Sequence, residues 1–287
     1  MSRIICVLDA CTIINIFCID DNNDLLFRKI LRILDLRIHS KVYAEVNSNF
    51  SSRTSLKGKE ASVYSKIGRL TPLVIHNNVI LDCCGQDYYD KVSSKSGYIK
   101  RNGEFYSIAL ALFISQLEDT KLTFFTDDSP AKNDFDYFYW INQIGQISDS
   151  VDLLLLLFRL DGKIKKRTIL EYLDNLYSEY ALSISNFLKD LRIVFSKINT
   201  ETKYRKKIGL KKKLHNLIKQ VDQNNFKNIL EQRDQLIQER VTILSKLLSI
   251  HKDVFLLSQS YNMENFLKKI REVQKIVSAN EIVRIIT

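Results

Sequence analysis

Short apolar runs alternate with segments of helical periodicity from residue 3 to residue 160, and this alternation constrains the fold more than any other feature. The runs are almost entirely apolar, as expected of strands that are buried on both faces of a sheet. Strands that alternate with helices along a chain form a parallel sheet covered by helices. The sequence therefore predicts an α/β domain that ends somewhere between residues 160 and 182.

The element boundaries follow from where each apolar run begins and ends. Strands are predicted within residues 3–8, 36–40, 73–82, 121–128 and 143–148, and in 73–82 the second half is expected to form the strand. Helices are predicted over residues 23–34, 42–50, 58–70, 85–95, 102–117, 129–136 and 148–160, where apolar residues recur at a spacing of three or four.

From about residue 168 onward the sequence contains no strand signal and no proline. Apolar residues recur at helical spacing over 168–198, 226–257 and 263–286. This pattern predicts an all-α bundle of three or four long helices, with its main break at Gly209. We therefore expect two domains, an α/β domain over residues 1–165 and a helical domain over residues 166–287.

The excess of positive charge lies in one part of the chain. Residues 150–220 contain 16 Lys and Arg against 7 Asp and Glu, whereas residues 1–149 contain 17 against 18. Such a block favours a nucleic-acid partner, although a lysine-rich solvated helix surface explains it equally well. The candidate nucleic-acid-binding residues of the basic segment 203–213 are Lys203, Arg205, Lys206, Lys207, Lys211, Lys212 and Lys213.

The five cysteines show no metal-ligand spacing, which favours a reducing, cytoplasmic location. No signal peptide is visible, and the longest apolar run, residues 153–158, is far too short to span a membrane. We therefore expect no membrane partner.

Acidic residues occur near the predicted carboxyl ends of several strands. Asp9 directly follows the first strand, and Asp127 and Asp128 follow the fourth. Glu45 lies in the helix after the second strand, and Glu104 lies near the start of a later helix. Parallel α/β sheets bind ligands at this edge. Carboxylates that converge there repel one another unless a divalent cation neutralises them, and oxygen ligands suit Mg²⁺ or Mn²⁺.

Each of these acids also has an ordinary structural explanation when it is taken alone. Asp9 is a suitable residue to cap a helix at its N-terminus. Glu45 fits a solvated helix surface, and Glu104 is a favourable charge in the first turn of a helix. Asp127 and Asp128 fit a turn. The active-site interpretation therefore depends on all of these positions together.

Four segments together resemble the signature regions of PIN-domain nucleases: "VLDACTIINIF" (7–17), "VYAEV" (42–46), "GEFYSIALAL" (103–112) and "FFTDDSPA" (124–131). The resemblance covers roughly residues 1–160 and nothing C-terminal to them. It implies a Rossmann-like fold with five parallel strands. It also implies Mg²⁺- or Mn²⁺-dependent cleavage of RNA, and bacterial members of the family are often toxins.

The resemblance assigns a role to each acid. Asp9, Glu104 and Asp128 would bind the metal, and Glu45 would bind it directly or through water. Asp127 would assist Asp128 or replace it, and the sequence does not decide between the two.

Other residues near these motifs carry weaker expectations. Cys11 stands where the family often has Ser or Thr, which calls into question a hydroxyl contact there. The first helix could direct Asn15 towards the carboxylates. Lys100 and Arg101 precede Glu104, and they would contact phosphates or serve as ordinary loop charges.

The sequence thus favours a metal-dependent endonuclease, most simply a ribonuclease, with a bacterial toxin or an antiviral defence effector as the expected role. A DNA-cleaving nuclease and a non-catalytic nucleic-acid-binding or scaffold protein are the alternatives. The helical half is expected to form a homo-oligomer or to dock a protein partner, although apolar stripes of this kind more often form an internal core than a partner surface.

Overall fold

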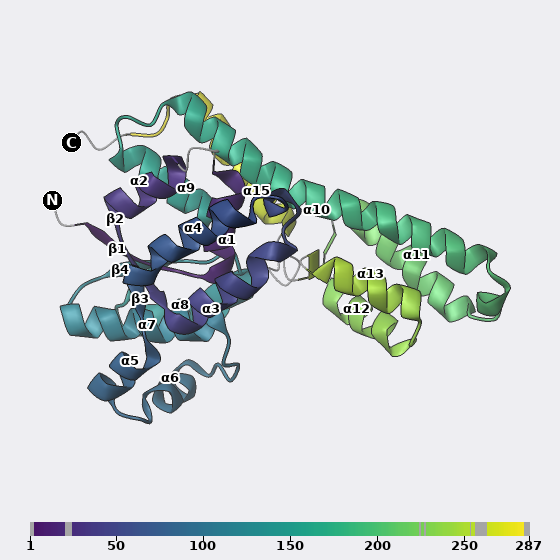
Figure 1. Cartoon of the computed structure of the whole chain (residues 1–287), viewed down its shortest axis with the longest axis horizontal. Helices are drawn as coiled ribbons and strands as arrows, with labels where there is room; N and C mark the ends of the chain where they lie inside the picture. Colours follow the sequence, from purple (N-terminus) through teal and green to yellow (C-terminus); the bar gives the residue numbers. More distant parts are fainter. Residues whose placement is uncertain are drawn as a thin grey trace. The chain divides into compact units, whose positions relative to one another are not determined.

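The computed structural model describes residues 3–20, 25–223, 225–226, 228–252, 254–255 and 263–283. The chain forms two compact units. The first unit comprises Met1–Leu176 together with Glu272–Thr287, and the second unit comprises Tyr177–Arg271. Figure 1 labels the helices and strands of both.

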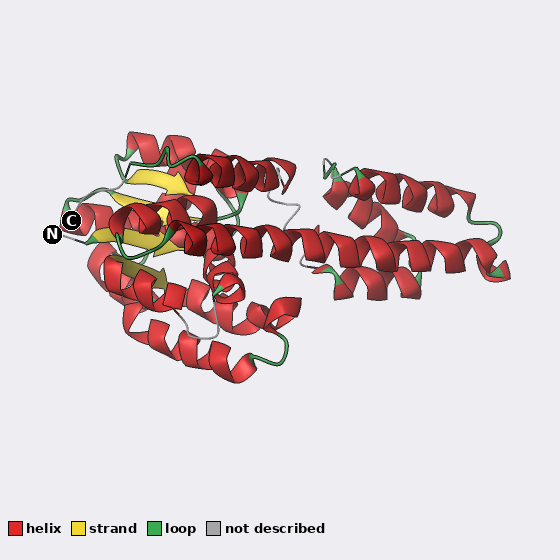
Figure 2. Ribbon diagram, turned by 90° about the horizontal axis from the view of Figure 1, so that it is seen from above, coloured by secondary structure: helices red, strands yellow, loops and turns green. Residues whose placement is uncertain are grey.

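The first unit is built on a five-stranded sheet in which every paired strand is parallel to its neighbour (Figure 2). Its strands are β1 (Ile4–Leu8), β2 (Leu34–His39), β3 (Val74–Ile75), β4 (Leu122–Phe125) and β5 (Gly145–Ser148). They are arranged in the order β3-β2-β1-β4-β5, a Rossmann-like order that reverses at β1. The predicted α/β class with a parallel sheet is confirmed.

Helices cover both faces of this sheet. On one face, α7 (Gly103–Glu118) and α8 (Ser129–Ile141) pack against strand residues such as Val7 and Phe124. On the other face lie α2 (Leu25–Ile33) and α9 (Ser150–Leu160), as Figure 1 shows. The remaining helices before residue 100 are α1 (Ala10–Ile19), α3 (Ser40–Asn49), α4 (Glu60–Leu70), α5 (Asn77–Cys84) and α6 (Tyr88–Ser96).

The prediction for residues 73–82 is wrong in one respect. The strand, β3, lies in the first half of this segment, and the second half begins helix α5. His76 has an extended backbone and occupies the position before the helix. Ile80 is buried, and Leu81 and Cys84 pack against the same core as Ile80, at the spacing of one helical face. Both halves of the segment are apolar, so its hydrophobicity did not distinguish a strand from a helix.

The two compact units do not coincide with the predicted boundary at residues 165 and 166. Helix α10 (Lys166–Thr200) begins in the first unit and continues without interruption into the second. Helix α15 (Met263–Ser278) likewise ends in the first unit, where Gln274 donates a hydrogen bond to Asp174 of α10 at 2.7 Å. A continuous helix contains no composition change at which a boundary could be recognised.

The second unit is helical, as predicted, but most of its helices are shorter than expected. They are the C-terminal part of α10, followed by α11 (Ile208–Asp222), α12 (Ile229–Gln238), α13 (Thr242–Ile250) and the start of α15. The break precedes Gly209, which lies inside α11, because the chain leaves the helix at Glu201 with an extended backbone. A second interruption occurs at Arg240, whose φ of 50° ends the predicted 226–257 helix early. Residues 224, 227, 253, 256–262 and 284–287 of the predicted helical region lie outside the described residues.

The apolar stripes of these helices are largely buried within the chain. Leu210, Leu214 and Leu217 of α11 are each at most 1% exposed, and Leu244, Leu247 and Leu248 of α13 are also buried. These stripes therefore form an internal core, one of the two possibilities left open by the sequence. Among the described helices, none combines the length and the apolar composition needed to cross a membrane.

Gly145, at the start of β5, provides a test of how closely the backbones of β4 and β5 pack. Its φ is +140°, and an added Cβ would lie 2.8 Å from the backbone nitrogen of Leu122 on β4. Because backbone atoms cannot yield as a flexible side chain can, we expect Gly145→Ala to lower the free energy of unfolding by about 3 kcal/mol. Gly162→Ala is the matched control, since nothing lies within 4 Å of its added Cβ. Equal stability of the two variants in chemical denaturation would contradict this packing.

Candidate active site

The carboxyl ends of β1 and β4 lie next to each other at the centre of the sheet, where the strand order reverses. The backbone N–H of Asp9 donates to the carbonyl oxygen of Phe125 at 3.0 Å. The hydroxyl of Thr12 donates to the same oxygen at 3.1 Å. In open parallel sheets this is the position at which ligands bind. The backbone that carries the candidate acids is therefore fixed by direct hydrogen bonds.

Asp9 caps helix α1 and accepts three hydrogen bonds. Its carboxylate accepts from the N–H of Ala10 at 2.7 Å, the thiol of Cys11 at 3.0 Å and the hydroxyl of Thr126 at 3.1 Å. The side chain is deeply buried, with the residue only 4% exposed. Burial raises the pKa of Asp9, the hydrogen bonds oppose this rise, and the nearby charge of Asp128 adds to it. Asp9 is thus a helix cap and, at the same time, a member of a group of carboxyls.

Glu104 and Asp128 are two further members of this group. Both residues are half-buried, and their carboxyl groups lie near enough for Asp128 to raise the pKa of Glu104. Burial raises the pKa of Glu104 to about 9, and the charges of Asp9 and Asp128 contribute to the rise. Asp128 also caps α8 by accepting a hydrogen bond from the N–H of Ala131 at 3.5 Å. Glu104 therefore retains its proton more readily than an isolated glutamate would.

Glu45 approaches the same group from helix α3. Its carboxylate accepts a hydrogen bond from the N–H of Gly103, the first residue of α7. Burial and the charge of Asp9 together raise the pKa of Glu45 to about 7, and the hydrogen bond from Gly103 opposes the rise. An added Cβ at Gly103 would lie 2.9 Å from Cδ of Glu45, so the glycine permits this close approach. The four predicted acids Asp9, Glu45, Glu104 and Asp128 are therefore linked electrostatically at one edge of the sheet.

Asp127 has different surroundings from Asp128. Its Oδ1 accepts from the N–H of Ser150 at 2.8 Å, and its Oδ2 accepts from the Ser150 hydroxyl and from Nδ2 of Asn15, each at 2.5 Å. Asp127 is 7% exposed. It joins β4 to α9 and α1 beneath the site, and Asn15 does point towards an acid, as predicted. The structure thus separates the two adjacent aspartates by their contacts.

Cys11 contacts the site although it replaces the expected hydroxyl residue. Its thiol donates to Asp9, and its sulfur accepts from the N–H of Asp127 at 3.4 Å. Burial raises the pKa of the Cys11 thiol, with the charges of Asp9 and Asp127 adding to the effect. The thiol is therefore held in its protonated form, in which it can donate to Asp9 as a hydroxyl would.

Several residues near the acids were not predicted as part of the site. Arg53 is buried and donates from Nη2 to Oδ1 of Asn15 at 3.3 Å. Tyr98 and Asn102 both donate hydrogen bonds to Glu104. Asn102 precedes a helix and is a favoured capping residue, so the sequence contained a signal for its position. The contact of Tyr98 depends on tertiary packing and had no such signal.

The two basic residues that precede Glu104 differ in how freely their side chains could contact a phosphate. Arg101 forms an ion pair with Asp90 at 2.6 Å and donates to the carbonyl of Tyr89 at 2.8 Å. Its guanidinium also lies over the ring of Phe105, 4.4 Å from the centroid. Lys100 is exposed. The Arg101 guanidinium therefore already has partners within the protein, as expected of an ordinary loop charge.

The basic segment 203–213 is only partly available to a ligand. Lys203 pairs with Glu201 at 2.8 Å, and Lys213 pairs with Glu239 at 2.7 Å. Lys207 donates to the backbone carbonyl of Glu239 at 3.3 Å. The remaining members are Lys211, which is half-buried, and the exposed Arg205, Lys206 and Lys212.

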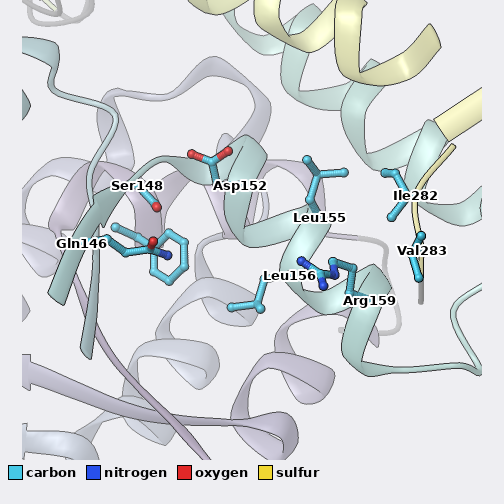
Figure 3. A pocket seen from close by; sticks show the side chains of 9 residues that line it. Gln146, Ser148, Asp152, Leu155, Leu156, Arg159, Ile282 and Val283 are labelled. Atoms are coloured by element: carbon cyan, nitrogen blue, oxygen red, sulfur yellow. The ribbon is translucent and has the colours of Figure 1, made fainter. Parts of the chain in front are cut away.

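A pocket elsewhere in the first unit contains none of the predicted site residues. It has a volume of about 460 Å³ and lies between β5, α9 and the C-terminal residues Ile282 and Val283. Leucine, isoleucine and valine side chains make up much of its lining (Figure 3). Asp152 is its acidic residue, and this carboxylate accepts a hydrogen bond from the N–H of Asp149 at the start of α9. The lining of the pocket therefore includes none of the four acids Asp9, Glu45, Glu104 and Asp128.

In the part of the chain that the structure describes, no three His, Cys, Asp or Glu side chains stand close enough together to hold a single metal ion. The four acids influence one another electrostatically without converging on one point. Binding of a cation would therefore require that their side chains turn towards each other.

Comparison with known proteins gives no relative from which a function could be transferred: no family model matches the chain, and no curated protein and no solved structure shows significant similarity.

The different surroundings of the two aspartates lead to a prediction about stability. Asp127→Asn places an amide N–H₂ where three donors now converge on a carboxylate, and we expect it to lower the free energy of unfolding by about 1–3 kcal/mol. Asp128→Asn should cost much less, because asparagine caps a helix as well as aspartate does. Asp134→Asn, an exposed position on the same helix α8, is the control. If Asp128→Asn proved the more damaging change in urea unfolding, the assignment of contacts would be wrong.

The raised pKa of Glu104 predicts how the stability of the metal-free protein depends on pH. In the unfolded chain Glu104 loses its proton near its ordinary pKa of 4.5, whereas in the folded chain it retains the proton up to about 9. The folded state binds more protons over this interval, so its stability falls as the pH rises through it. Glu104→Gln removes this pH-dependent loss of stability. It should raise the free energy of unfolding by at least about 1 kcal/mol near pH 8 but not near pH 4. Glu281→Gln, at an exposed position, is the control.

A gain from Glu104→Gln that is the same at both pH values would exclude this explanation. Denaturant unfolding in the presence of a chelator provides the measurement.

Proposed function

We propose that this protein is a metal-dependent endonuclease with a PIN-like first unit, and that it hydrolyses phosphodiester bonds in RNA. The observation that supports the proposal most strongly is that the Thr126 side chain joins the buried Asp9 to Asp128, with Glu104 near enough for both acids to raise its pKa. Like charges this close are stable only when they share protons or bind a cation. Their position at the ends of β1 and β4 is where a parallel sheet binds its ligand.

The chemistry of the donor set fits a hard divalent cation. Asp9, Glu104 and Asp128 would hold Mg²⁺ or Mn²⁺ through carboxylate oxygens, and Glu45 would bind it directly or through water. When bound, such an ion neutralises the phosphate charge and lowers the pKa of a coordinated water molecule. The raised pKa values of Asp9, Glu45 and Glu104 indicate a site that favours added positive charge.

The neighbouring residues orient these acids. Thr126 donates its hydroxyl proton to Asp9, and its oxygen accepts from the N–H of Asp128 at 3.1 Å, so one side chain contacts both acids. The Cys11 thiol donates a second hydrogen bond to Asp9. Asp127 contributes by fixing β4 against α9 through Ser150, and it is not proposed as a ligand.

The proposed substrate class follows from charge and from the resemblance to PIN-domain nucleases. Lys100 is exposed and lies four residues before Glu104. In the second unit, Arg205, Lys206 and Lys212 are exposed members of the basic segment 203–213. Contacts from such residues to phosphates would add salt-dependent affinity without sequence preference. A role as a toxin or defence effector remains an expectation from the resemblance.

A cleavage assay tests the proposal. Labelled single-stranded RNA and DNA are incubated with the protein and Mn²⁺ or Mg²⁺, with and without a chelator. We expect metal-dependent cutting of RNA by the wild type, and a loss of at least about 100-fold in Asp9→Asn and Asp128→Asn. Both substitutions retain a helix-capping side chain. The stability of Asp9→Asn is measured as well, because its carboxylate accepts three hydrogen bonds. Asp134→Asn should cut like the wild type.

Three results would count against the proposal. Cutting that persists in Asp9→Asn and Asp128→Asn would place the chemistry elsewhere. Cutting of DNA alone would retain the nuclease but change its substrate. Salt-sensitive binding of nucleic acid without cutting, by wild type and variants alike, would favour a non-catalytic binding or scaffold protein.

A further inference from the structure

Tyr98 is held firmly at the edge of the proposed site, in the segment between α6 and α7. Its ring packs on Phe135 of α8, with the ring centroids 4.6 Å apart, and is stacked near Phe105 of α7 at 6.5 Å. Its backbone carbonyl accepts a hydrogen bond from the hydroxyl of Ser93 at 2.6 Å. Both the ring and the backbone are therefore fixed, and so is the position of the hydroxyl group.

The Tyr98 hydroxyl is directed at one of the proposed metal ligands. It donates to Oε2 of Glu104 at 3.2 Å and accepts from Nδ2 of Asn102 at 3.0 Å. Nδ2 of Asn102 also donates to Oε2 of Glu104. Two donors from separate side chains thus converge on a single carboxylate oxygen.

Asn102 is itself fixed by its place in the fold. It caps α7, and its Oδ1 accepts from the N–H of Phe105 at 3.3 Å. With Oδ1 committed to the helix, the Nδ2 group faces Glu104 and Tyr98. The side chain therefore combines a structural contact through oxygen with a site contact through nitrogen.

The same tyrosine connects the two helices that carry the carboxyl pair. Glu104 lies in the first turn of α7, and Asp128 caps α8. Because the Tyr98 ring packs against Phe105 of α7 and Phe135 of α8, it fixes the spacing of these helices next to the two acids. A purely apolar side chain could fill this space, but it would leave Oε2 of Glu104 without the hydroxyl donor.

We propose that Tyr98 and Asn102 are positioning residues that orient the Glu104 carboxylate for metal binding, an inference that rests on the proposed function. Carboxylates that bind metals are commonly held by such outer hydrogen bonds, and loss of one partner weakens metal affinity by about 10–100-fold. The two donors act on Glu104 and not on the substrate.

The test measures the dissociation constant for Mn²⁺ by calorimetry, together with the thermal stability of each metal-free protein. Tyr98→Phe removes the hydroxyl and keeps the ring. Asn102→Ser retains a capping oxygen but lacks the Nδ2 donor, and it provides a second variant should the first fold poorly. Tyr88→Phe is the matched control, since the hydroxyl of Tyr88 donates to the carbonyl of Ala109 at 2.8 Å, within the core.

We expect Tyr98→Phe and Asn102→Ser each to bind Mn²⁺ about 10-fold more weakly than the wild type, whereas Tyr88→Phe binds it normally despite its own loss of stability. A purely structural role would instead weaken binding in proportion to the stability lost in each variant. If the wild type binds Mn²⁺ and cuts RNA while both variants bind Mn²⁺ within about twofold of it, this inference is overturned and the proposed function stands. Absence of Mn²⁺ binding by the wild type would overturn both.

Discussion

Four carboxyl groups, of which Asp9 is buried and the others are half-buried, repel one another at the carboxyl edge of the sheet, and this repulsion is the main constraint on the surrounding contacts. Asp9 is 4% exposed, and the charges of Asp9 and Asp128 both raise the pKa of Glu104 beside them. Without a cation, this arrangement is tolerated because N–H, O–H and S–H donors surround the acids and because some of the acids retain protons. The hydrogen bonds to Asp9 from Ala10, Cys11 and Thr126 are part of this response.

The sheet supplies the fixed frame for these groups. β1 and β4 are paired in parallel, and the backbone hydrogen bond from Asp9 to Phe125 extends this pairing to the residue that carries the first acid. α7 then brings Glu104 to the site and receives Glu45 at Gly103, a position where any larger residue would displace the glutamate. Asp127, which lies beside Asp128 in sequence, is turned the other way and ties β4 to α1 and α9.

Much of this could be predicted from sequence, because strands, strand ends and long amphipathic helices have local signals. The apolar run before Asp9 predicted β1, and the three-to-four spacing after residue 168 predicted α10. The remaining features depend on tertiary structure. Residues 73–82 are apolar throughout, so the short β3 and the helix α5 could not be separated. Adjacent Asp127 and Asp128 differ only in what each contacts, and α10 crosses from one unit to the other without a break.

The most direct test of the proposed metal site is a crystal structure of the protein soaked with Mn²⁺, with anomalous data collected near the manganese edge. We expect an anomalous peak bound by carboxylate oxygens of Asp9, Glu104 and Asp128, with their side chains turned towards it. No peak at this edge of the sheet in millimolar Mn²⁺, or a peak bound only by other residues, would contradict the claim that these acids form a metal site.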